Sequence, residues 1–238
     1  MGETGNMSEL HIRVMCIPEN IKFEECKGYL SVISSSRFRK INKFLFDKDK
    51  LVSIATELFV KYCITCDTGL MPVNYEFEYN EYGKPYIGFV SDYFFSVSHS
   101  HRTIVFVSSD SEIGVDIEKI SRNVSAIQIA RRLFTDDEAD YICRYNNSDL
   151  YKRFFEIWTR KEAYVKRLGT GLYTSIESFS VLEECRNCRL MTFCHNNQMI
   201  SVCCDRKYDS VCADDVSFNV VRQFLNNCLI KLSCGQSG

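Results

Sequence analysis

The chain has 238 residues, 45% of them hydrophobic, which allows one large domain or two small ones with a packed core. Its 29 basic and 31 acidic residues give a net charge of −2, which excludes the global basic field of a nonspecific nucleic-acid-binding protein. No apolar run approaches the ~20 residues of a membrane-spanning helix, and no N-terminal segment has the pattern of a secretory signal. We therefore expect a cytoplasmic protein without a nucleic-acid or membrane partner, in which any anion site is local.

The 13 cysteines are scattered along the chain, and we interpret them as reduced thiols. Cys63 with Cys66, and Cys185 with Cys188, have the CxxC spacing that zinc and redox sites use. With so many cysteines such pairs arise by chance, and these two lie far apart in the sequence. A shared zinc site is therefore the less favoured interpretation.

Hydrophobic periodicity in the first half predicts a strand, then helices, then short strands. The first strand is expected over residues 12–17, and apolar residues three and four apart predict helices over 23–33 and 37–66. Alternation over 73–79 predicts a strand that ends at the turn 82–85. Three further strands, rich in β-branched and aromatic residues, are expected over 94–97, 103–107 and 113–117.

The second half repeats this order. Helices are expected over 124–134, from a capping box at 135–138 through 145, and over 150–168. Strands are expected over 179–182, 191–194, 199–204 and 216–221. The sequence therefore predicts an α+β fold of two similar subdomains in a pseudo-twofold arrangement, each a small antiparallel sheet packed with helices. We place the subdomains at residues 1–109 and 110–238.

Two acidic clusters carry the strongest chemical signal. Asp116 and Glu118 stand at i and i+2 in a β-branched run, so a strand directs both to one face. Glu162 and Lys166 lie one helical turn apart. Three carboxylates and a lysine are suited to holding Mg²⁺ against a diphosphate. The alternatives are solvated strand charges and ordinary ion pairs of Lys161, Glu162 and Lys166 on an exposed helix.

Two other segments offer groups that could bind phosphate. Ser98 and His99 follow one another where a predicted strand ends, and hydroxyl and imidazole groups can hydrogen-bond phosphate. Arg37, Lys40 and Lys48 belong to a basic stretch that could bind a terminal phosphate, or could be a solvated helix face.

Taken together, the motifs resemble those of the larger, surfactin-synthetase-activating type of phosphopantetheinyl transferase. The matching segments stand in that family's order between about residues 37 and 182: Tyr82-Gly83-Lys84-Pro85, residues 95–100, residues 113–118, Phe134-Thr135, residues 158–166 and residues 169–172. The chain departs from the family at Ser96, where members often have asparagine, and at Val52, near which they often have a basic residue.

The resemblance implies transfer of the 4′-phosphopantetheine arm of coenzyme A to a serine of an apo acyl, peptidyl or aryl carrier protein. It implies that Asp116, Glu118 and Glu162 hold Mg²⁺, for which Mn²⁺ can substitute, and that these residues act in catalysis with Lys166. Lys166 is implied to contact the diphosphate, and Gly83, Lys84, Ser98 and His99 to bind coenzyme A. Arg37, Lys40 and Lys48 are implied to meet its 3′-phosphate, and the enzyme is expected to be a monomer.

The chemistry needs no enzyme nucleophile, because the carrier serine can attack phosphorus directly once its proton is removed. Glu162, or a water held by the metal beside it, is the expected base. Two other functions stay open at this point. One is a magnesium-dependent hydrolase of nucleotides or phosphodiesters, and the other is a noncatalytic module that binds coenzyme A or zinc.

Overall fold

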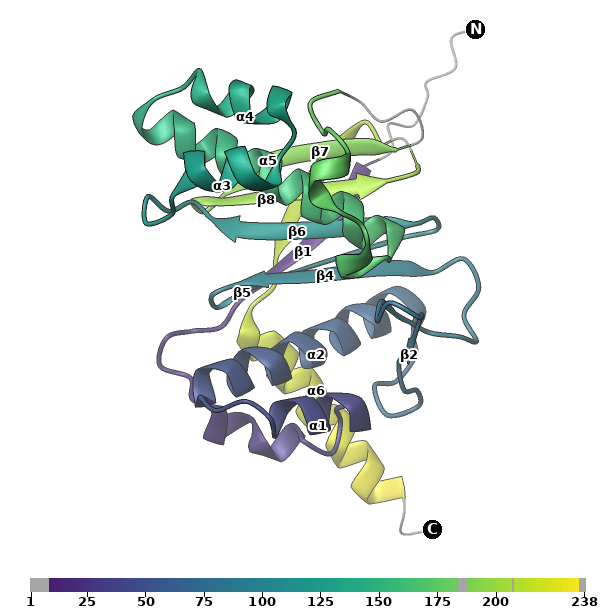
Figure 1. Ribbon diagram of the computed structural model, residues 1–238. Coiled ribbons are helices and arrows are strands. Elements are labelled where there is room, and N and C mark those ends of the chain that lie inside the picture. Colours follow the sequence, from purple (N-terminus) through teal and green to yellow (C-terminus); the bar gives the residue numbers. More distant parts are fainter. Residues whose placement is uncertain (1–8, 184–187, 207, 236–238) are drawn as a thin grey trace, which may run out of the picture.

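The computed structural model describes residues 9–183, 188–206 and 208–235, and it shows helices on the outer faces of two small sheets (Figure 1). The first sheet contains, in spatial order, β4 (Phe94–Ser100), β5 (Thr103–Ser109), β1 (Glu9–Cys16) and β9 (Ser210–Asp215). The second contains β6 (Ile113–Lys119), β8 (Gln198–Cys204) and β7 (Arg189–His195). β2 (Glu78–Tyr79) and β3 (Pro85–Tyr86) form a separate two-stranded ribbon. The predicted α+β class is confirmed.

The helices divide between the two sheets. Those beneath the first sheet in Figure 1 are α1 (Ser35–Ile41), α2 (Asp47–Thr68) and α6 (Phe218–Gly235). Those above the second are α3 (Ala126–Leu133), α4 (Asp136–Cys143) and α5 (Asn147–Leu168). Three short 3-10 helices are η1 (Phe23–Tyr29), η2 (Gly171–Tyr173) and η3 (Ile176–Ser178). A core cluster between the sheets includes Ile12, Val107, Val115 and Val202, which are fully buried.

The first sheet is mixed, not purely antiparallel as the sequence predicts. β1 pairs antiparallel with β5 and parallel with β9, which comes from the far end of the chain. α6 then follows β9, and its Phe218, Val221 and Leu225 join the core under the first sheet. Elements from both ends of the chain thus complete one sheet and its helical layer. The division at residues 109 and 110 stays a prediction.

Two long helices share features that the predicted duplication implies. α2 and α5 each have 22 residues and each end at a glycine in the left-handed conformation, Gly69 and Gly169. Each also carries one fully buried lysine whose ammonium donates to two backbone carbonyls of the following loop. Lys61 contacts Pro72 and Tyr75 in this way, and Lys161 contacts Ile176 and Phe179.

Several predicted elements differ from the structure. Residues 37–66 form two helices, because the chain turns between Ile41 and Asp47. Residues 179–182 form no strand. The strand predicted over 216–221 is wrong as well: most of this segment begins α6, where Ser217 accepts a hydrogen bond from the backbone N–H of Asn219. Its β-branched valines suggest a strand, but Phe218, Val221 and Leu225 repeat at helical intervals and pack into the core.

Candidate active site

A row of serines joins the two sheets at the centre of the molecule. Ser96, Ser98 and Ser100 alternate along β4, so they point to the same face, toward β6, and all three are buried. Ser96 accepts a hydrogen bond from the backbone N–H of Val115 at 3.0 Å. Ser98 donates to Asp116 Oδ1 at 2.7 Å, and Ser100 donates to Glu118 Oε2 at 2.9 Å. The serines therefore orient the carboxylates of β6.

The structure brings Asp116, Glu118, Glu162 and Lys166 together, as the sequence predicts. Asp116 and Glu118 project from β6 toward α5, which carries the other two residues. Lys166 Nζ lies 2.7 Å from Asp116 Oδ1 and donates to Ser98 Oγ at 2.6 Å. The second oxygen of Asp116, Oδ2, is buried without a hydrogen-bond partner. A buried carboxylate oxygen in this state is costly unless something binds it.

The electrostatics of the cluster favour added positive charge. Burial, and then the negative charge of Asp116, raise the pKa of both Glu118 and Glu162. Lys166 opposes this shift but does not cancel it. The oxygens of the three carboxylates do not form a group in which every ligand atom lies within 4.8 Å of the others. Among the described residues, only His11, Cys212 and Asp214 form such a group. Glu118 and Glu162 are only partly buried, so their side chains can rotate toward a shared ion.

Gly114 is a site residue that the sequence analysis did not single out. A Cβ atom at this position would lie 2.1 Å from the carbonyl oxygen of Ala163 and 2.3 Å from the backbone nitrogen of Arg167. Both are backbone atoms of α5, so the helix can approach β6 this closely only over a glycine. The close approach sets the spacing between the acids of β6 and Glu162 and Lys166. The glycine beside the acidic pair was the available signal.

We expect Gly114→Ala to lower both stability and activity, because α5 must move away from β6 to admit the methyl group. Overpacking of this kind costs about 1–3 kcal/mol of unfolding free energy. Urea unfolding and initial transfer rates measure the two effects. Gly28→Ala is the matched control, since a Cβ at Gly28 has no neighbour within 4 Å. Wild-type stability and activity in Gly114→Ala would contradict the spacing role.

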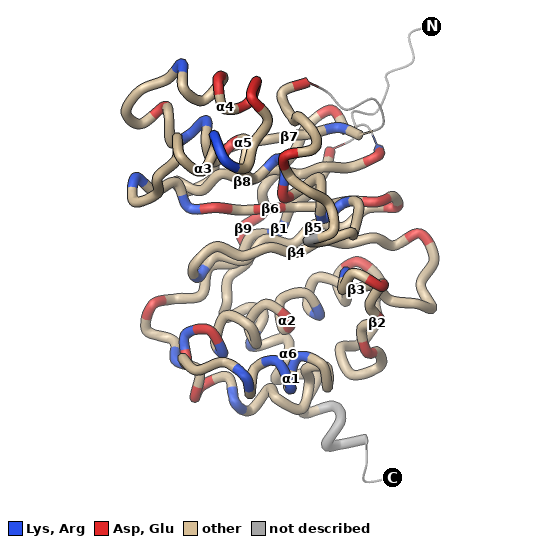
Figure 2. Tube along the Cα trace, in the orientation of Figure 1, with Lys and Arg blue, Asp and Glu red and all other residues tan. Residues whose placement is uncertain are grey.

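A cationic pocket lies next to the cluster. It has a volume of about 250 Å³, and its lining includes Arg37, Lys40, Val52 and His99. Desolvation and the nearby Arg37 lower the pKa of Lys40, and desolvation followed by Lys166, Lys40 and Arg37 lowers that of His99. The pocket thus gathers positive charge, consistent with the basic residues of α1 in Figure 2.

The residues of the predicted basic stretch line two different pockets. Arg37 Nε donates at 3.0 Å to the fully buried carboxylate of Glu57, which fixes the guanidinium beside the pocket. Lys48 lines an adjoining pocket of about 680 Å³, next to the ring of Phe46. The two pockets share Asp49, Val52 and His101, so Lys48 lies near the predicted group but not within it.

A second small pocket lies on the side of the cluster formed by the turn at 82–85. It has a volume of about 240 Å³, and its lining includes Gly83, Lys84, Ser96 and Lys166. The ammonium of Lys84 is already engaged, at 2.5 Å from Glu112 Oε2 and 2.9 Å from the carbonyl oxygen of Arg167. Lys84 therefore lines the pocket while its charge ties the turn to the end of α5.

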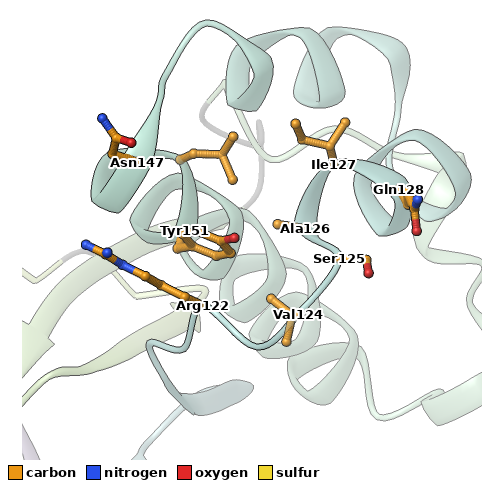
Figure 3. A pocket seen from close by; sticks show the side chains of 9 residues that line it. Arg122, Val124, Ser125, Ala126, Ile127, Gln128, Asn147 and Tyr151 are labelled. Atoms are coloured by element: carbon orange, nitrogen blue, oxygen red, sulfur yellow. The ribbon is translucent and has the colours of Figure 1, made fainter.

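Two further features of the structure lie outside the candidate site. Lys161 is fully buried and forms an ion pair with Glu138 at 2.7 Å, so the alternative of an exposed pair on α5 is wrong for this residue. A pocket of about 520 Å³ between α3 and α5, lined by Val124, Ile127 and Tyr151 among others, contains none of the predicted site residues (Figure 3). The predicted residues on β4, β6 and α5 lie elsewhere, in the acidic cluster and beside it.

Among the described residues, Cys63 and Cys66 belong to no group of three or more metal-ligating side chains. Cys63 is buried, and desolvation raises the pKa of its thiol well above the ordinary value. Cys185 lies outside the described residues.

Among the helices of the described ranges, none is long and apolar enough to cross a membrane.

Comparisons with known proteins agree with this geometry. Residues 112–220 match the 4′-phosphopantetheinyl transferase superfamily, and residues 20–111 match the N-terminal part of 4′-phosphopantetheinyl transferases. The transferase gsp of Aneurinibacillus migulanus is 33% identical over 68% of this chain and 67% of its own length. The transferase Sfp of Bacillus subtilis strain 168 is 30% identical over 66% of this chain and 70% of its own length.

An α+β architecture with acids on a strand, a Glu and a Lys on the facing helix, and a cationic pocket beside them defines an enzyme that acts on phosphate groups. The chain belongs to the 4′-phosphopantetheinyl transferase superfamily and is of the type to which Sfp belongs. The transferase hypothesis is confirmed over the hydrolase and the noncatalytic module.

Proposed function

We propose that this protein transfers the 4′-phosphopantetheine arm of coenzyme A to the hydroxyl of a serine on an apo acyl, peptidyl or aryl carrier protein. The serine oxygen forms a bond to the phosphorus that bears the arm, and the bond between the two phosphates of coenzyme A breaks. Adenosine 3′,5′-bisphosphate leaves. The observation that carries the proposal is the buried, unpartnered Oδ2 of Asp116, which lies among two more carboxylates and a lysine.

The acidic cluster fits a hard divalent cation, Mg²⁺ or Mn²⁺. Asp116 Oδ2 lacks a partner, and the charge of Asp116 makes ionisation of Glu118 and Glu162 less favourable. Asp116, Glu118 and Glu162 offer only oxygen ligands, which Mg²⁺ prefers. When bound, the ion supplies positive charge that stabilises the diphosphate and the departing phosphate.

Coenzyme A is proposed to occupy the two pockets that flank the cluster. The 3′-phosphate suits the pocket of Arg37, Lys40 and His99, because its negative charge offsets the mutual repulsion of these groups. The pocket lined by Gly83 and Lys84 holds another part of the nucleotide. Lys166 borders that second pocket and also contacts Asp116, so its ammonium can reach a diphosphate between the two pockets.

The proton of the serine is proposed to pass to Glu162. Burial and the nearby Asp116 raise the pKa of Glu162, which makes its carboxylate a stronger base than an exposed one. Lys166 stabilises the charge that develops on the leaving phosphate. Ser98 holds Lys166 and Asp116 in place through its hydrogen bonds, so we assign it to positioning these groups beside the coenzyme. We further propose that the enzyme works as a cytoplasmic monomer.

The test is incubation of the full chain with coenzyme A, Mg²⁺ and a panel of apo carrier proteins, followed by mass spectrometry. We expect the mass of the arm on at least one carrier and none on a variant whose acceptor serine is alanine. Release of free phosphopantetheine without a modified carrier would indicate hydrolysis instead. A panel that stays unmodified would overturn the proposal.

We expect Lys40→Ala to raise KM for coenzyme A by about 10- to 150-fold while kcat changes little, since a lost charge-assisted contact costs about 1.5–3 kcal/mol. With dephospho-coenzyme A, which lacks the 3′-phosphate, the variant and the wild type should differ much less. Arg39→Ala is the control, because Arg39 is on α1 but does not line the pocket. An equal effect of Lys40→Ala on both substrates would place the 3′-phosphate elsewhere.

A further inference from the structure

A second group of metal-ligating side chains lies where the two ends of the chain pair in the first sheet. His11 on β1 is the register partner of Cys212 on β9, and Asp214 follows Cys212 two positions later. All three side chains lie on the same face of the sheet, opposite the face where Leu10, Ile12 and Val14 pack into the core. The ligand atoms of His11, Cys212 and Asp214 are all within 4.8 Å of one another.

The distances within this group are close to those of a metal site. His11 Nδ1 is 2.9 Å from Asp214 Oδ2, and Cys212 Sγ is 3.7 Å from Asp214 Oδ1. Nitrogen, oxygen and sulfur ligands around one tetrahedral Zn²⁺ lie about 3.3–3.8 Å apart, given bond lengths of about 2.0–2.3 Å. Small rotations of exposed side chains are enough to reach this geometry.

The charge around the group also favours a cation. Glu9 is on the same face, with Oε2 3.7 Å from His11 Nε2. Within the described ranges, His11 is the only ion-pair partner of either Glu9 or Asp214. Arg13 is the register partner of Asp214, but its guanidinium contacts Asp67 at 2.6 Å instead. Two carboxylates therefore face an imidazole and a thiol, and in the described ranges neither carboxylate forms an ion pair with a lysine or arginine.

We propose that His11, Cys212 and Asp214 form a Zn²⁺ site, with water as the fourth ligand. A mixed nitrogen, sulfur and oxygen set suits Zn²⁺ and is a poor match for Mg²⁺, which prefers oxygen. The site is separate from the transferase centre, because none of its residues lines the pockets that flank the acidic cluster.

The position of the site indicates what the ion does. β9 is an edge strand, and its parallel pairing with β1 joins segments about 200 residues apart in the chain. A Zn²⁺ ion bound to both strands crosslinks them and holds α6, which follows β9, beneath the first sheet. The ion thereby stabilises the fold and takes no part in phosphate transfer.

The test uses Co²⁺ as a spectroscopic probe for Zn²⁺ on the reduced full chain, with Mg²⁺ present. We expect one equivalent of Co²⁺ to produce a saturable thiolate-to-metal absorption band, which Zn²⁺ removes by displacement. Cys212→Ser and His11→Ala should each abolish the band. Cys194→Ser, at an exposed cysteine of β7, should keep it.

Thermal unfolding provides the second measurement. Zn²⁺ should raise the midpoint of unfolding of the wild type and of Cys194→Ser, but not that of Cys212→Ser or Asp214→Asn. Transfer activity of the wild type in Mg²⁺ checks the transferase function independently. No saturable band, or a band that survives His11→Ala and Cys212→Ser, would overturn the zinc site whatever the activity. A band without a rise in the unfolding midpoint would overturn the crosslinking role.

Discussion

Replacing Asp116 with asparagine is expected to lower the rate of carrier modification by about 10²–10³-fold, the cost of losing one preorganised electrostatic contact at a reacting centre. Asparagine keeps the size of the side chain but removes the negative charge of the carboxylate. One oxygen of that carboxylate contacts Lys166, and the other, Oδ2, has no hydrogen-bond partner. Glu118, Glu162 and Lys166 then face a diphosphate without the carboxylate that Lys166 contacts. Initial rates at saturating coenzyme A, Mg²⁺ and carrier measure the effect.

The control for this prediction is Asp149→Asn, which removes an exposed carboxylate in the first turn of α5. It should retain wild-type rates. Circular dichroism and the unfolding midpoint of Asp116→Asn should show a folded protein, because Ser98 can still donate to the amide oxygen. An Asp116→Asn enzyme with full activity would remove this residue from the proposed metal site.

Replacing Glu138 with alanine is expected to lower the unfolding free energy by about 3–5 kcal/mol, the cost of breaking a fully buried ion pair from one side. Glu138 contacts Lys161 at 2.7 Å, and the exposed fractions of the two side chains are 0% and 1%. It also accepts hydrogen bonds from the backbone N–H groups of Thr135 and Val181. The change therefore leaves a buried ammonium and two backbone donors short of partners.

Urea unfolding measures this loss, and two comparisons separate its causes. Glu138→Gln should be less damaging than Glu138→Ala, because it can still accept the backbone hydrogen bonds. Combining Glu138→Ala with Lys161→Met should recover part of the stability, since no buried charge is then left unpaired. A loss below about 1 kcal/mol, as for a surface pair, would mean that water reaches Lys161 in the variant.

Local patterns explain which parts of the fold the sequence predicts. The capping box at Thr135 begins α4 as expected, and β-branched and aromatic residues mark β4, β5 and β6. These features depend on neighbours within a few residues. The valines of residues 216–221 favour a strand locally, which is why the sequence predicts one there. Burial of Phe218 and Leu225 against the first sheet selects a helix, and that partner is distant in the sequence.

The site, like the fold, has features that local patterns predict and others that only the structure shows. Asp116, Glu118, Glu162 and Lys166 could be chosen because their spacing on a strand and a helix directs each pair to one face. The serine alternation of β4 carried a similar signal, but only the structure shows that Ser100 holds Glu118 and that Ser96 holds the backbone of Val115. These contacts run between strands of two different sheets.

The sequence by itself determined the class of fold, the family resemblance and the residues around which the chemistry is proposed, because motif order and side-chain periodicity are properties of short segments. Tertiary structure alone decided how closely α5 approaches β6 over Gly114, which oxygen of Asp116 is left without a partner, and that Lys161 is a buried structural cation. It also brought His11 beside Cys212. Each of these depends on contacts between segments far apart in the chain, and no local pattern encodes their distances.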